Sequence, residues 1–174
     1  MPKILRWSLI SFSILCTAAW PARGEYFSNM RGVQIAEARQ ASAKAFDSIA
    51  ELMNGLASLE LADDAKAKMQ LVESITTMNQ AAGEFQVLAE KNMTLPLDVK
   101  FPDALTELAQ TSEVSAEKIA TVGDVLALTS QSLTTAAGVL DRFVKEPTTD
   151  NYTALRKSIE NTLRTGDLGS KLLQ

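Results

Sequence analysis

The chain has 174 residues with 17 Lys+Arg, 21 Asp+Glu and no His, which gives it a formal net charge of −4 at pH 7. An acidic chain with interspersed charges repels nucleic acid and anionic lipid, so nucleic-acid binding is excluded. Di-iron bundles need Glu-x-x-His pairs, which a chain without histidine cannot supply. We therefore expect no metal centre and no cofactor.

The first 24 residues have the pattern of a secretory signal peptide. A short positive start is followed by an apolar run from Trp7 to Ala19, and small residues end the segment. This run is shorter than the roughly 20 apolar residues that span a bilayer. Cleavage fits after Ala19 or after Gly24, and we favour Gly24, which starts the mature chain at Glu25.

Two other interpretations of this segment stay open, a lipid anchor on Cys16 and an uncleaved anchor. The bulky Leu15 before Cys16 argues against lipidation. Cleavage after Gly24 would remove every Cys and Trp, three basic residues and no acidic one, which leaves 14 basic and 21 acidic residues and a net charge of −7. A domain of about 150 residues without disulfides is typical of the bacterial envelope. We expect an exported protein, periplasmic or secreted.

Two long helices are predicted next, over about Phe27–Leu61 and Ala65–Lys91. Both are rich in Ala, Leu, Glu, Gln and Met, which are good helix formers, and their apolar residues recur with a seven-residue pattern. The sequence Ala62-Asp63-Asp64 predicts a turn between them, because Asp accepts hydrogen bonds from the free N–H groups at a helix start.

Residues 92–101 interrupt the pattern and predict the longest connection. Pro102 suits the first position of a third helix, which we expect to run to about Lys145. Its seven-residue phase does not slip at Gly123, so one continuous helix is favoured over two, and a bend at Gly123 is the alternative.

A fourth, shorter helix is expected from Asp150 to about Thr165, because Gly166 is a natural helix stop. Residues 167–174 then form a loose C-terminal tail, although Leu168, Leu172 and Leu173 can dock. The sequence thus predicts an all-α protein, an elongated up-and-down antiparallel bundle of about four helices over residues 25–166, after the signal peptide.

Small hydroxyl residues occupy several seam positions of the predicted helices. One hypothesis is a cavity that holds a small apolar or amphipathic ligand; the other is close helix packing, with each hydroxyl bonded to its own helix. The candidate ligand-lining residues are Ser42, Met53, Met78, Phe85, Ser112, Ser115 and Thr129.

No catalytic motif is present, since the acidic residues do not share a seam and so do not converge. We therefore expect a non-enzymatic protein without catalytic, cofactor-binding or metal-binding residues. The leading hypothesis is an exported bundle that acts through protein–protein contacts in the cell envelope. The alternative is a bundle that binds a small molecule or a lipid.

Overall fold

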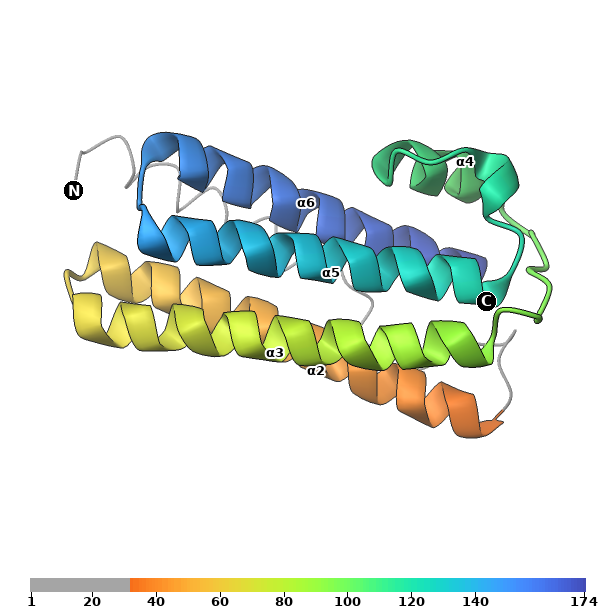
Figure 1. Cartoon of the computed structure of the whole chain (residues 1–174), viewed down its shortest axis with the longest axis horizontal. Helices are drawn as coiled ribbons and strands as arrows, with labels where there is room; N and C mark the ends of the chain where they lie inside the picture. The colour runs from red at the N-terminus through yellow and green to blue at the C-terminus, as the bar shows by residue number, and fades with distance from the viewer. Residues whose placement is uncertain (1–31) are drawn as a thin grey trace.

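The structure, a computed structural model, describes residues 32–174. Four long helices run antiparallel along one axis: α2 (Gly32–Glu60), α3 (Asp64–Lys91), α5 (Val122–Lys145) and α6 (Thr149–Leu172). The short helix α4 (Pro102–Thr111) and a 3₁₀ turn, η1 (Ala116–Lys118), lie at one end (Figure 1). The predicted all-α, elongated up-and-down antiparallel bundle is confirmed.

Each long helix packs on the next one along the chain: α2 on α3, α3 on α5 and α5 on α6, while α4 packs on α6. The core has two parts. The part near α4 is rich in alanine and includes Ala38, Ala45, Ala81 and Ala89. The part near the α2–α3 turn holds larger side chains, including Phe143 and Tyr152, whose ring centroids are 6.0 Å apart. The part near α4 thus contains more small side chains than the part near the α2–α3 turn.

The predicted turn between the first two helices is confirmed. Asp63 caps α3, and its carboxylate accepts a hydrogen bond of 3.2 Å from the backbone N–H of Lys66. Ala62 has a φ of 59°, and the N–H of Asp63 donates back to the carbonyl of Ser58 at 3.0 Å. This is the left-handed helix ending that normally uses glycine.

The continuous third helix predicted over residues 102–145 is wrong. The chain leaves the helix after Thr111 through Glu113, which has a φ of 56°, and α5 starts afresh at Val122. A capping box begins α5: the Thr121 hydroxyl accepts from the N–H of Asp124 at 3.1 Å, and the Asp124 carboxylate accepts from the N–H of Thr121 at 2.8 Å. These two bonds satisfy donors that a helix start leaves free, so they favour a new helix here over a continuous one.

The loose tail predicted for residues 167–174 is also wrong, because α6 passes through Gly166 and ends only at Leu172. Leu168, Leu172 and Leu173 are buried in the alanine-rich part of the core, so the docking of these three residues is confirmed. A Cβ at Gly169 would lie 3.3 Å from the Val125 side chain, so glycine lets α6 approach α5 closely.

The predicted signal peptide, both candidate cleavage sites, Cys16 and the start expected for the first helix lie outside the described residues. Within residues 32–174 we find no helix that has both the length and the hydropathy to cross a membrane.

Candidate binding surfaces

The structure does not bring the predicted ligand-lining residues together. Met78 and Phe85 are buried in different parts of the core, and Met53 packs at the edge of the part that contains Met78. Thr129 is buried, and its hydroxyl donates to the carbonyl of Val125 in its own helix at 3.1 Å. Ser42 is half-buried. The buried members of this set, Met78, Phe85 and Thr129, pack among the side chains of the bundle interior.

The break after α4 separates the two remaining candidates. Ser115 is exposed and precedes η1, whereas Ser112 follows α4 and lines a pocket. The continuous helix predicted from the sequence would have placed both residues on one inward face. Because the chain turns at Glu113, Ser112 and Ser115 do not share a helix face.

Three buried hydroxyls that were not among the predicted candidates link neighbouring helices. Ser74 of α3 donates to the carbonyl of Ser48 in α2 at 2.7 Å. Ser130 of α5 donates to that of Ala82 in α3 at 2.8 Å. Thr162 of α6 reaches the carbonyl of Ser132 in α5 at 3.1 Å. Each bond joins consecutive helices and satisfies a buried polar group, which makes these hydroxyls structural.

The pocket that contains Ser112 lies between the outer faces of α5 and α6 and has a cavity volume of about 240 Å³. The C-terminal end of α4 contributes to its wall. We name it the hydroxyl pocket, because Ser and Thr predominate among its lining residues: Thr111, Ser112, Glu113, Leu128, Gln131, Ser132, Thr135, Ser158, Asn161, Thr162 and Thr165. Glu113 is the one charged residue in this lining.

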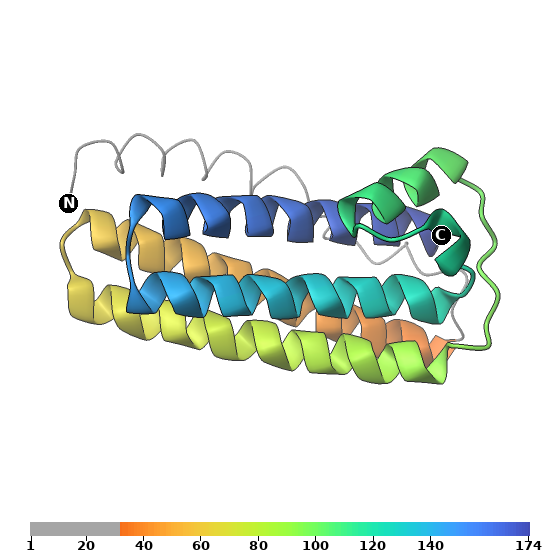
Figure 2. The same cartoon turned by 45° about the horizontal axis from the view of Figure 1, so that its top comes forward.

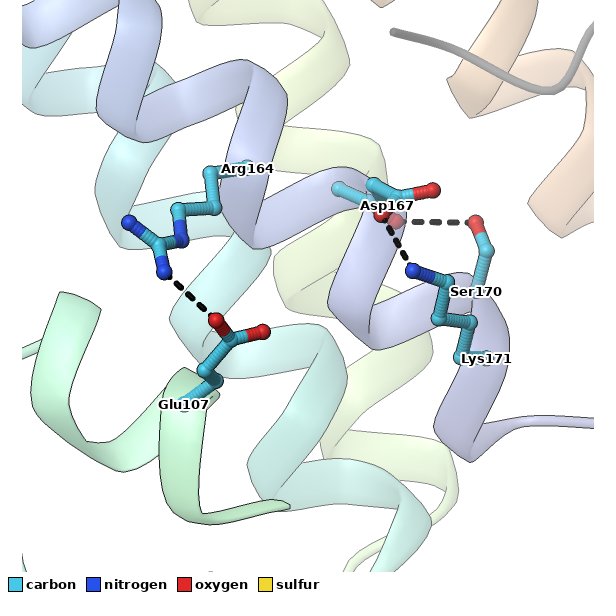
Figure 3. Close-up of polar contacts among 6 residues, drawn as sticks. Glu107, Arg164, Asp167, Ser170 and Lys171 are labelled. Atoms are coloured by element: carbon cyan, nitrogen blue, oxygen red, sulfur yellow. Dashed lines mark hydrogen bonds and ion pairs between the residues drawn. The ribbon is translucent and has the colours of Figure 1, made fainter. Parts of the chain in front are cut away.

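An ion pair beside the hydroxyl pocket ties α4 to α6. A guanidinium nitrogen of Arg164 lies 2.6 Å from a carboxylate oxygen of Glu107, and Figure 3 shows these two side chains meeting between the helices. Glu107 lies one turn before Thr111, and Arg164 directly precedes Thr165, so the pair adjoins two residues of the pocket wall. Both side chains are about half exposed, so the pair orients α4 more than it stabilises the fold.

A wider groove lies between α2 and α3, with a cavity volume of about 540 Å³. Its lining includes Glu37, Lys44, Glu84 and Lys91. Lys44 pairs with Glu84, and Lys91 pairs with Glu37 at 2.8 Å. The four charges of this groove thus pair among themselves. Electrostatic attraction would therefore contribute little to the selection of a ligand there.

Three exposed apolar side chains lie on the connection between α3 and α4. Met93, Val99 and Phe101 have exposed fractions of 51%, 37% and 45%. We name these three residues the apolar end. The connection runs along the end of the bundle where α3 stops and α5 starts (Figure 2).

Hydrogen bonds to the start of α5 hold this connection in place. The N–H of Leu97 donates to the carbonyl of Ala120 at 3.0 Å, and that of Val122 donates to the carbonyl of Leu95 at 2.9 Å. Pro96 and Thr121 form an isolated antiparallel bridge between these bonds. These bonds fix the backbone of the connection at residues 95–97, between Met93 and Val99.

No family model matches the chain, and neither the search of characterised proteins nor that of solved structures finds a match.

Proposed function

We propose that this chain is an exported, non-enzymatic helical bundle that acts by binding a protein partner in the cell envelope. The proposal of export comes from the signal-peptide pattern of residues 1–24. The proposal of partner binding comes from one observation, the exposed apolar end on a connection that hydrogen bonds hold in place.

The physical argument is that the apolar end combines suitable chemistry with a pre-organised backbone. Phe and Met are enriched in protein interfaces, where aromatic anchors contribute much of the binding energy. A segment that is already ordered loses less conformational entropy on binding than a flexible one. The partner that fits is a protein with a concave apolar patch that contacts Met93, Val99 and Phe101, which are all exposed.

The test compares two sets of surface substitutions in the full-length gene, expressed in its own cells. One variant carries Met93→Ser and Phe101→Ser in the apolar end. The matched control carries Met69→Ser and Val72→Ser, which replace exposed apolar residues of α3 near the α2–α3 turn. Chemical cross-linking in intact cells, followed by purification and mass spectrometry, measures which partner each protein retains.

We expect the unmodified protein and the control to retain the same specific partner and the apolar-end variant to lose it. Equal retention by both variants would overturn the assignment of the apolar end. The mass of the exported protein tests export separately, with a polypeptide that begins at Glu25 as the expected result.

A further inference from the structure

The two helical walls of the hydroxyl pocket carry no charged residue, and Glu113, after α4, is the one charge in its lining. Its α5 wall presents Leu128, Gln131, Ser132 and Thr135, which are spaced three or four positions apart and so share one helix face. Its α6 wall presents Ser158, Asn161, Thr162 and Thr165 with the same spacing. Both walls are uncharged, and all of these residues except Leu128 are polar.

Some hydroxyls of the pocket are held by their own helices and act mainly as acceptors. Ser132 donates to the carbonyl of Thr129, and Thr135 donates to that of Gln131, each at 2.9 Å. A hydroxyl oxygen that donates its hydrogen still has lone pairs that accept. These groups therefore offer fixed acceptor positions to a ligand.

Other polar groups of the pocket are free to donate as well as accept. Among residues 32–174, the side chains of Ser112, Ser158, Asn161 and Thr165 have no hydrogen-bond partner. A hydroxyl or an amide in this state can both donate and accept. The α5 wall thus offers mainly acceptors, and the α6 wall offers groups that can both donate and accept.

We propose that the hydroxyl pocket binds a small neutral polyol, the class that includes monosaccharides and cyclitols. Each hydroxyl of such a ligand both donates and accepts, which matches the mixed character of the walls. The pocket volume of about 240 Å³ is below the range of about 300–1,000 Å³ that is usual for drug-sized ligands, so it suits a single ring.

The charges around the pocket disfavour acidic ligands. Glu113 is in the lining and would repel a carboxylate or a phosphate. Two cations adjoin lining residues in sequence, Lys157 beside Ser158 and Arg164 beside Thr165. Neither is part of the lining, and Arg164 is paired with Glu107. A neutral sugar should therefore bind better than the corresponding uronic acid.

The experiment is a titration of the isotopically labelled full-length protein, with backbone amide shifts recorded by NMR. The probes are glucose, galactose and myo-inositol, with glucuronate and glutamate as charged comparisons. We expect at least one neutral probe to saturate with a dissociation constant on the order of 1 mM. The shifts should concentrate in residues 111–113, 128–135 and 158–165, and glucuronate should bind more weakly.

A double variant, Ser158→Ala with Thr165→Val, removes two of the free hydroxyls and should weaken binding about tenfold or more. The matched control is Thr76→Val on the exposed face of α3, which should leave binding unchanged. Shifts of the unmodified protein that are absent or scattered outside the pocket would overturn the proposal, as would tighter binding of glucuronate or glutamate. These titrations need no variant, so the proposal stays falsifiable if the double variant fails to fold.

Discussion

Gly123 lies directly against the backbone of Ala89. A Cβ at Gly123 would come within 2.7 Å of the Ala89 carbonyl oxygen and 2.8 Å of the Met93 backbone nitrogen. The N–H of Gly123 also donates to the carbonyl of Asn92 at 3.2 Å. This contact brings the first turn of α5 onto the last turn of α3, and it helps to hold the connection that carries the apolar end.

Gly123→Ala should therefore destabilise the fold. The atoms that the new methyl group would meet belong to the backbone, which cannot move aside as a side chain can. We expect the free energy of unfolding to fall by about 2 kcal/mol or more, measured by urea denaturation. Gly138→Ala in the same helix is the control, since nothing lies within 4 Å of its added Cβ; it should stabilise the protein by up to about 1 kcal/mol. Equal effects of the two substitutions would refute the close contact.

Ala62→Gly should stabilise the protein. Ala62 has a φ of 59° at the end of α2, a conformation that costs an L-residue roughly 1–2 kcal/mol and glycine much less. We expect a gain of about 1 kcal/mol in the free energy of unfolding, seen as a rise in Tm. The control is Ala57→Gly at an exposed position inside α2. It should lower the free energy of unfolding by about 1 kcal/mol. If Ala62→Gly also lowered the free energy of unfolding, the result would contradict the left-handed helix ending.

Leu172→Ala tests the docking of the C-terminal end of α6. Leu172 is buried in the alanine-rich part of the core, so truncation should cost about 2–5 kcal/mol. Its neighbour Lys171 is exposed and forms an i,i+4 pair with Asp167 at 2.8 Å (Figure 3). Lys171→Ala should cost at most about 0.5 kcal/mol, measured in the same denaturation series. If Leu172→Ala lowered the free energy of unfolding as little as Lys171→Ala, the result would support a loose C-terminal tail and contradict the docking.

Tyr152→Phe tests a buried hydroxyl that lacks a hydrogen-bond partner among the described residues. Burial raises the pKa of the Tyr152 phenol, the nearby Arg156 opposes this rise, and Glu60 adds to it. At neutral pH the substitution should leave stability unchanged or raise it by about 1 kcal/mol, because an unsatisfied polar group leaves the core.

The raised pKa of Tyr152 also predicts how stability depends on pH. The folded state holds the phenolic proton more tightly than the unfolded state, where the pKa of tyrosine is about 10. The stabilisation linked to the phenolic proton of Tyr152 is therefore fully present below about pH 10. It is lost as the pH rises above about 10. Urea denaturation at several alkaline pH values should show the unmodified protein losing stability faster than Tyr152→Phe. Parallel pH curves would contradict the pKa shift.

The seven-residue pattern correctly predicted an all-α bundle of long helices, because packing against a neighbour requires an apolar face and such a face is visible in one sequence. It could not reveal the break between α4 and α5, because Leu108, Ser112, Ser115 and Ile119 keep the phase of a helix through the turn. The local signal was Thr121 with Asp124 three positions later, which form the capping box that starts α5.

The prediction that the fourth helix ends at Gly166 was wrong for a related reason. A glycine near the end of a periodic segment is a common helix stop, yet Gly166 is buried inside α6, and Gly169 packs against α5. Only knowledge of the neighbouring helix separates a glycine that ends a helix from one that admits close packing. The hydroxyl pocket could not be predicted from the sequence for the same reason. Its walls meet only because α5 and α6 lie side by side and α4 turns back over them.

The most direct test of the proposed function is site-specific photo-cross-linking in intact cells. A photoreactive amino acid at position 99, in the apolar end, is compared with one at Leu61, which is 83% exposed at the α2–α3 turn. We expect a discrete cross-linked product of one reproducible mass from position 99 and none from position 61. No product from position 99, or the same products from both positions, would contradict it.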